Sequence, residues 1–356
     1  MNLRNNLPYI FLFICFISNC KNTNHVAITT VSSKIKDSSV ILLPIATDYN
    51  TSCSEENIYV YQDSMLIIHH KADSLTKLIS IYNMLRKNTV YSNFDYGASN
   101  NNLLSASISI HRDSLIVYDV IKGYVYSICI DSTIKKAHYQ PKGHKSNILT
   151  QFMLPYKDAL LCLNPYSFKD INTKYNNRAP RFILSTNDFQ YNEKHKYKYD
   201  TFNVVNGHFI INFQRGRIVY FSRNEDYFEI FNLDKKLIKK VFGPDNIKPK
   251  YFKYDNGYSD EILYLGNIPI SYISSCYSNN YIYVTYCGNR LDIKKNSDLS
   301  QYPTYIFKFD WNGNIINSYY TENYIKNISI ANDERYIFSW EMNKNKELKL
   351  VKYYME

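Results

Sequence analysis

Short runs of alternating apolar and polar residues recur from about residue 55 to the end of the chain, separated by turns that hold a charged or polar pair. Alternation with a period of two predicts strands with one buried face, and a short polar turn between two such runs predicts a hairpin. The second strand of each hairpin is predicted at 64–69, 114–119, 159–163, 217–221, 281–285 and 335–340. The hairpin turns lie near Asp63, Asp113, Lys157, Arg215, Asn280 and Asp333, so the unit repeats about every 50 residues.

Further strands follow most of these hairpins. A third strand is predicted at 124–130, 180–184, 227–232 and 305–310, and a fourth at 236–242 and 315–320. Four antiparallel strands, repeated six times, are the composition of an all-β, six-bladed β-propeller. The first and third units are the least regular.

The sixth unit stops after a third strand at 348–354. A blade without its outer strand exposes a sheet edge, which invites aggregation. We expect the apolar segment 40–45, upstream of the first blade, to supply the missing strand. Pro44 is tolerated there because an outermost strand has one unpaired edge.

The pattern at the N-terminus predicts a signal peptide for export. Arg4 precedes an apolar run at 7–17, which is shorter than the roughly 20 residues needed to span a bilayer and suits a signal peptide. The tetrapeptide Ile-Ser-Asn-Cys that ends at Cys20 resembles a bacterial lipobox, with Asn19 in place of the usual small residue. The expected organisation is a lipoprotein signal at 1–19, a tether at 20–38 and the propeller at 39–356. The alternative is an ordinary secretory signal with an incidental cysteine.

Lipidation of Cys20 would anchor the chain in the bacterial cell envelope. The tether after it lacks an acidic run, so we expect the outer membrane, facing the periplasm. Five cysteines follow Cys20, which is an odd number, and they lie mostly in apolar runs. We expect free, buried thiols, with a Cys276–Cys287 disulfide as the alternative.

The composition adds 36 Tyr residues and a formal net charge of +10. Lys, Asn, Ile and Tyr all have AT-rich codons, so a genome low in GC would produce this balance without a partner selecting it. No recognition-helix, RNA-binding or zinc-finger pattern accompanies the charge, and we expect no nucleic-acid partner.

Three parts of the sequence are similar to one known family. These are the lipobox, the segment 96–131 that ends in DSLIVYDVIKGYVYSICID, and the closing segment YIFKFDWNGNIINSYY at 305–320. In these three places the sequence resembles the TolB-like six-bladed propeller lipoproteins. The resemblance implies the fold and an envelope location. Members of this family usually carry a Gly-rich loop with a Glu before the second blade. The corresponding loop here, Tyr96 to Asn100, has one Gly and no Glu.

The sequence contains no GxSxG, HExxH, Walker or GxGxxG pattern. His69 and His70 are adjacent on a predicted strand, so their side chains should point to opposite faces and could hardly share a metal. We therefore predict no catalytic residue, no metal and no cofactor. The alternative is a hydrolase or lyase that assembles a site in the central channel from distant blades.

The long connections are predicted to lie on one side of the ring. With strands a to d numbered from the axis outward, the a–b and c–d turns reach one side, here called the turn face. The b–c and d–a connections reach the other side, the loop face. The long segments expected on the loop face are 84–103, 139–148, 165–180, 190–203, 243–267 and 288–303.

These segments are rich in Lys, Arg and Tyr, residue types that suit carboxylate, phosphate or sugar recognition. The predicted function is a monomeric, non-enzymatic binding or scaffold module for a peptide, glycan or protein partner. Ordinary solvated loops remain an equal alternative. The candidate ligand-binding residues, chosen by loop position, are Tyr96, Lys145, Arg178, Lys198, Tyr258 and Arg290.

Overall fold

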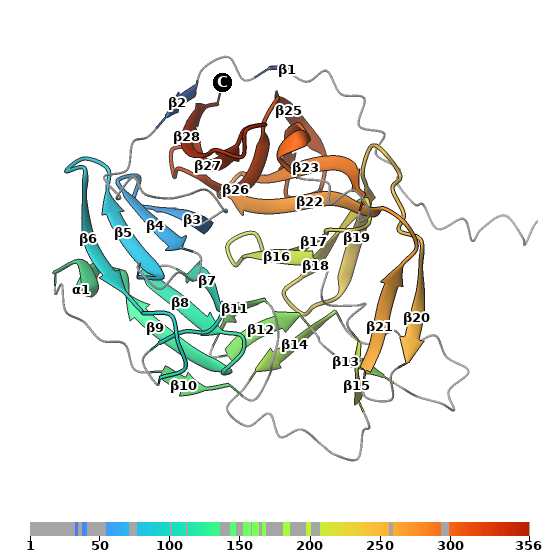
Figure 1. Cartoon of the computed structure of the whole chain (residues 1–356), viewed down its shortest axis with the longest axis horizontal. Helices are drawn as coiled ribbons and strands as arrows, with labels where there is room; N and C mark the ends of the chain where they lie inside the picture. Colours follow the sequence, from blue (N-terminus) through green and yellow to red (C-terminus); the bar gives the residue numbers. More distant parts are fainter. Residues whose placement is uncertain are drawn as a thin grey trace, which may run out of the picture.

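The structure is a computed structural model. It describes residues 33–34, 38–40, 55–70, 77–99, 102–111, 113–135, 143–146, 152–157, 159–163, 166–168, 181–185, 197–200, 207–255, 259–292 and 299–355. Six sheets are arranged around a central axis, which confirms the predicted all-β, six-bladed propeller (Figure 1). Within the described ranges, no helix is long and apolar enough to cross a membrane.

The first three blades lie between residues 55 and 185. Blade one holds β3 (Glu55–Tyr61), β4 (Met65–His70), β5 (Ile79–Asn83) and β6 (Asn88–Asn93). Blade two holds β7 (Ala106–His111), β8 (Ser114–Asp119), β9 (Tyr124–Cys129) and β10 (Gly143–Lys145), with the helix α1 (Ile130–Lys135) after β9. Blade three holds β11 (Met153–Tyr156), β12 (Ala159–Leu163) and β14 (Phe182–Ser185).

Blades four to six lie between residues 207 and 354. Blade four holds β16 (Gly207–Asn212), β17 (Arg217–Ser222), β18 (Tyr227–Asn232) and β19 (Leu237–Phe242). Blade five holds β22 (Ile268–Tyr277), β23 (Tyr281–Leu291), β24 (Thr304–Asp310) and β25 (Ile315–Thr321), with the 3₁₀ turn η1 (Leu299–Gln301) before β24. Blade six holds β26 (Tyr324–Ile330), β27 (Tyr336–Met342) and β28 (Leu348–Tyr354).

Every predicted second strand coincides with a b strand of a blade, but two of the segments expected to be long loops supply the outermost strand of a blade. Residues 84–87 form a short c–d turn, and β6 then completes a regular first blade. Within 139–148, β10 is the fourth strand of blade two. Both strands are largely polar, because an outermost strand is exposed on one side and carries no clear apolar alternation.

The N-terminal segment closes the ring, as predicted. The strand β2 (Ser38–Val40) pairs antiparallel with β28, with Ser38 opposite Tyr353 and Val40 opposite Val351. It overlaps the predicted 40–45 only at Val40, and residues 41–45 lie outside the described residues. The strand β1 (Ser33–Lys34), which we did not predict, adds to blade five in parallel with β25. An edge strand needs backbone partners more than apolar side chains, so hydrophobicity was a poor guide to its position.

A seventh sheet lies at the periphery of the ring (Figure 1). Its order is β13 (Tyr166–Phe168), β15 (Tyr197–Asp200), β21 (Ser259–Tyr264) and β20 (Tyr251–Asp255). These strands come from the segments 165–180, 190–203 and 243–267, which we expected to be irregular throughout. The loop-face connections of blades three and four therefore pair partly with one another.

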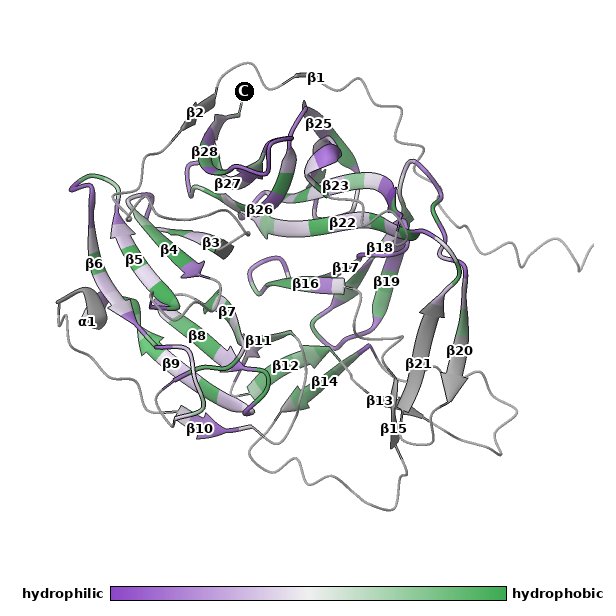
Figure 2. Ribbon diagram, in the orientation of Figure 1, coloured by the Kyte–Doolittle hydropathy of each residue, from purple (hydrophilic) through white to green (hydrophobic). Residues whose placement is uncertain are grey.

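The hydrophobic core is divided into six clusters, one at each junction between neighbouring blades. The cluster between blades four and five includes Phe228, Tyr272, Phe309 and Trp311. The cluster between blades six and one joins the two ends of the propeller through Ile58, Leu66 and Trp340, among others. Figure 2 shows hydrophobic residues along the blade strands and hydrophilic residues at most turns. Each blade therefore buries both of its faces, which explains the apolar runs in the inner strands.

None of the four described cysteines that follow the tether forms a disulfide. Cys162 and Cys287 are buried, Cys276 is half-buried and Cys129 is exposed. Burial was therefore predicted correctly for the first two and wrongly for Cys129.

Deleting β1 and β2 should destabilise the ring, because it exposes the outer edges of blades five and six. We expect a chain that starts at residue 41 to lose about 2 kcal/mol of unfolding free energy, the value of a few backbone hydrogen bonds. Urea unfolding would measure it. A chain that starts at residue 33 is the matched control and should unfold at the midpoint of the longer chain. Equal midpoints for the two truncations would contradict a closing role for β2.

Candidate ligand site in the central channel

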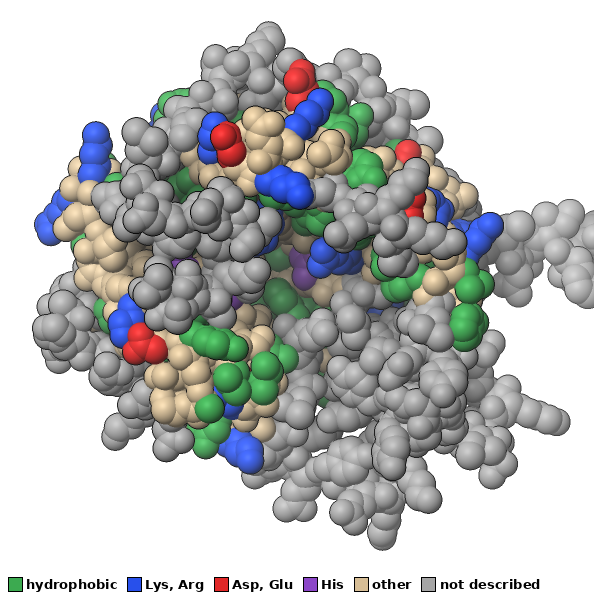
Figure 3. Space-filling view, in the orientation of Figure 1, with side chains coloured by type: hydrophobic (Ala, Val, Ile, Leu, Met, Phe, Trp, Pro, Cys, Tyr) green, Lys and Arg blue, Asp and Glu red, His purple; other side chains and the backbone are tan. Residues whose placement is uncertain are grey.

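The inner strands of all six blades enclose a cavity of about 1020 Å³ on the axis of the ring. Its walls come from β3, β7, β11, β16, β22 and β26. The volume is at the upper end of the range, about 300–1000 Å³, of small-molecule pockets. The space-filling view shows a hollow at the centre of the ring, where a histidine and basic side chains are visible (Figure 3). The channel is therefore large enough for a ligand of considerable size.

Charge is segregated along this channel. Arg223 lies in the b–c turn of blade four and Lys326 near the start of β26, so both line the loop-face end. Asp113 and Glu334 lie in a–b turns and line the opposite, turn-face end. Asp113 accepts a hydrogen bond from Tyr61 Oη at 2.8 Å. Among the described lining residues, the cavity thus has a basic end and an acidic end.

Bulges interrupt the inner strands at the loop-face end. In blade six, Ile325 pairs with Glu341 and Asn327 with Trp340, which leaves Lys326 as the extra residue. The inner strands β3 and β22 carry similar register shifts near their own loop-face ends. A bulge bends the strand and changes the direction of a side chain. This accounts for a lysine that faces the cavity from an otherwise buried strand.

A hydrogen-bond network fixes these bulged strands to one another. Asn327 Nδ2 donates to Asn57 Oδ1 and to Ser274 Oγ, both at 3.1 Å. Asn327 Oδ1 accepts from the backbone N–H of Ile58 at 3.0 Å. One amide therefore joins blades one, five and six, and the wall of the channel beside Lys326 is held rigidly.

Two histidines lie near the cations. His208, near the start of β16, stacks on Phe221 with ring centroids 5.4 Å apart, and His69 lies 3.4 Å from Asn57 through its Nδ1. Burial, together with the charge of Arg223, lowers the pKa of His208 to about 3. Burial lowers the pKa of His69 to about 3, with contributions from His70 and Lys326. Both rings are therefore neutral at physiological pH. Among the described lining residues, the positive charge of this end comes from Arg223 and Lys326.

Comparison with known proteins identifies the family. The family model of TolB-like six-bladed propellers matches residues 57–333, which is most of the chain. This chain belongs to the TolB-like propeller family. No curated protein sequence matches it.

Two solved structures resemble this TolB-like propeller over nearly its whole length. A member of the DUF4221 family from Bacteroides vulgatus ATCC 8482 is 11% identical, with a TM-score of 0.56, and the match covers 91% of this chain and 99% of that one. A "putative exported protein" from Bacteroides fragilis NCTC 9343 is 10% identical, with a TM-score of 0.50, and the match covers 92% and 98% of the two chains. At this identity the similarity demonstrates a shared fold.

The predicted ligand residues are spread around the TolB-like propeller. Tyr96 lies in the d–a crossing after blade one, Lys145 on β10, Lys198 on β15 and Arg290 near the end of β23. Arg178 and Tyr258, like Cys20, lie outside the described residues. Among Tyr96, Lys145 and Arg290, whose side chains the structure describes, no hydrogen bond or ring contact joins one to another. The Arg290 guanidinium donates to the carbonyl of Lys248 at 3.2 Å.

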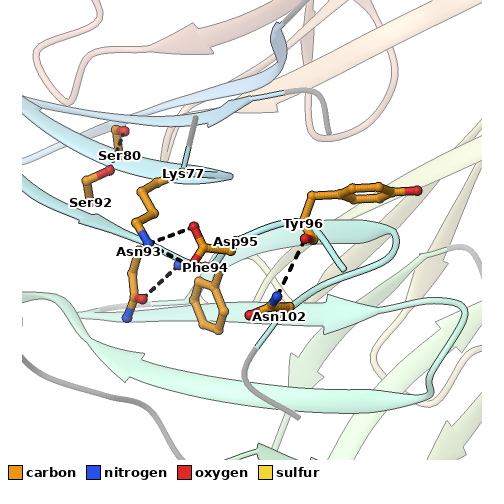
Figure 4. A network of polar contacts seen from close by, with 8 residues as sticks. All are labelled: Lys77, Ser80, Ser92, Asn93, Phe94, Asp95, Tyr96 and Asn102. Carbon is orange, nitrogen blue, oxygen red and sulfur yellow. Dashed lines mark hydrogen bonds and ion pairs between the residues drawn. The ribbon is translucent and has the colours of Figure 1, made fainter. Parts of the chain in front are cut away.

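The loop that carries Tyr96 is well supported (Figure 4). Lys77 Nζ bonds both carboxylate oxygens of Asp95, at 2.7 and 2.8 Å, and Asn102 Nδ2 donates to the carbonyl of Tyr96 at 3.5 Å. Gly97 has φ of 147°, a conformation that other residues rarely adopt. Tyr96 is 48% exposed, and its ring points away from these contacts, so it is available to a partner on the loop face.

Arg223 and Lys326 are not among the residues predicted from the sequence, because those were chosen from long loops. Arg223 occupies a short turn, and Lys326 occupies a strand. One signal was present: Lys326 and Asn327 form a polar pair that interrupts an apolar inner strand.

A second polar cluster lies at the loop-face side of the junction between blades four and five. Asp226 Oδ2 accepts from the backbone N–H of Asp245 at 2.7 Å, and Tyr286 Oη donates to Asp245 Oδ2 at 2.7 Å. A Cβ at Gly243 would lie 1.7 Å from Asp226 Oδ1, so only glycine fits there. Burial raises the pKa of Asp226 to about 6, and the charge of Asp245 adds to the effect, while the Asp245 N–H opposes it.

The raised pKa of Asp226 predicts that the free energy of unfolding depends on pH. Between its ordinary value of 3.8 and about 6, the folded chain binds the proton of Asp226 more tightly than the unfolded chain. The stability that Asp226 contributes is therefore complete below pH 4 and is lost as pH rises through 6. We expect Asp226→Asn to be more stable than the native chain at pH 7.5, by on the order of 2 kcal/mol, and nearly equal at pH 4.

Thermal unfolding of both proteins from pH 4 to 8 would measure this difference. Asp234→Asn, in an exposed turn of the same blade, is the matched control and should show no such trend. A gain for Asp226→Asn that is the same at every pH would contradict the assignment.

Proposed function

We propose that this TolB-like propeller is an exported, lipid-anchored binding or scaffold module of the bacterial cell envelope. It takes a peptide, glycan or protein partner on its loop face and does not transform it. The observation that carries the proposal is the wide axial cavity, whose basic end opens on the face that also presents Tyr96 and Arg290. A rigid ring with one elaborated face is a common arrangement for recognition by repeat proteins.

Export and anchoring rest on the N-terminal sequence. The apolar run at 7–17 and the lipobox-like tetrapeptide before Cys20 support a lipidated leader, and one structural neighbour carries a description as exported. The strands β1 and β2 hold the chain at the outer edges of blades five and six, beginning at residue 33. A tether of 12 residues, 21–32, would then separate the lipid from the ring.

Replacing Cys20 should release the protein from the membrane, because the acyl chains supply the anchoring free energy. We expect Cys20→Ser to move from the membrane pellet to the soluble fraction of fractionated cells and to lose incorporation of labelled fatty acid. Cys129→Ser, which alters an exposed thiol on the propeller, is the matched control and should stay in the pellet. Undiminished incorporation of labelled fatty acid into Cys20→Ser would refute the lipid anchor.

Site-specific photo-crosslinking in cells tests the binding face. A photoreactive phenylalanine in place of Tyr96 or Arg290 should give discrete adducts, because both positions are exposed on the loop face. The same residue at Leu237, which is 55% exposed near a c–d turn on the turn face, should give none. Adducts of equal yield at all three positions, or at none, would argue against a partner on the loop face.

A further inference from the structure

Hydrogen bonds hold the backbone that carries two cations at the loop-face end of the channel. The carbonyl of Arg223 accepts from the backbone N–H of Ser271 at 2.7 Å, and the amide of Asn224 donates to the carbonyl of Pro269. The turn that carries Arg223 is thereby attached to the inner strand of blade five. Its guanidinium is exposed and lines the cavity.

Lys326 is fixed in a comparable way from the other side. It is the bulged residue of β26, and the next residue, Asn327, is held by its bonds to blades one and five. Because the backbone under both cations is already held, binding of an anion has to order only the two side chains, which favours affinity.

The surroundings of these cations favour an anion. The described carboxylates that line the cavity, Asp113 and Glu334, are at its opposite end, and the nearby rings of His69 and His208 are neutral. Guanidinium and ammonium groups bond carboxylate and phosphate oxygens more strongly than neutral donors do.

We propose that the loop-face end of the channel binds a small ligand through a carboxylate or phosphate group, with Arg223 and Lys326 as the two cationic anchors. The cavity of about 1020 Å³ accommodates the rest of such a ligand. The inference rests on the proposed binding function and names the chemical class that this end of the channel recognises.

Isothermal titration of the purified propeller with citrate and with inorganic phosphate tests the proposal, and maltotriose serves as a neutral comparison. We expect the native protein to bind at least one of the two anions and to bind it more weakly as salt is raised. Arg223→Gln and Lys326→Gln should each weaken that binding about tenfold, the order of one charge-assisted hydrogen bond.

Lys344→Gln is the matched control. Lys344 is exposed in the b–c turn of blade six, on the same face, but it does not line the cavity. Its replacement removes the same charge and should change the affinity by less than about twofold, because distant surface charges are screened. Thermal unfolding of each variant would verify the fold, and exposed Arg223 carries the test if Lys326→Gln does not fold.

The outcomes separate this inference from the proposed function. Failure of both anions to bind, or an equal loss in Lys344→Gln, would overturn the anion site. Binding of maltotriose together with no binding of either anion would also overturn it, while leaving a binding role intact. Anion binding that depends on Arg223, together with no crosslinks from the loop face in cells, would support the site and count against a macromolecular partner.

Discussion

Closure of the ring is the constraint on which the rest of this structure depends. Each blade buries one face against the preceding blade and the other against the following blade, so the first and last blades must also meet. They do so through the cluster around Ile58 and Trp340, and the backbone N–H of Asn332 donates to Asp63 at 2.6 Å. The edge left by the short sixth blade is covered by β2, so the chain uses its N-terminal segment to complete its last unit.

The channel is a product of that closure. Its wall beside Lys326 depends on the amide of Asn327, which reaches Asn57 from a position 270 residues away in sequence. The common direction of the inner strands also separates the cations of the channel from its carboxylates, because every a strand runs from the loop face to the turn face. A cation early in an inner strand and a carboxylate in an a–b turn must then lie at opposite ends of the channel.

The connections on the loop face have two different destinations. Those of blades three and four contribute to the peripheral sheet of β13, β15, β21 and β20, outside the ring. The connection within blade five instead brings Leu299, in η1, to the channel. The face therefore combines an outlying sheet with an axial site, and the polar contacts of Asp226 lie at the blade junction between them.

The sequence by itself determined the number of blades, the b strands and the need for an N-terminal closing strand. These features follow from local alternation of apolar residues and from its repetition, which a linear pattern records directly. It did not locate the outermost strands β6, β10 and β2, because a polar edge strand is defined by the backbone partner it finds. Only the tertiary structure decided the site. Arg223 and Lys326 belong to different blades and become neighbours of one cavity when the ring closes, and a single bulge turns Lys326 toward it. No periodicity in the sequence encodes either event, since both depend on contacts between segments far apart in the chain.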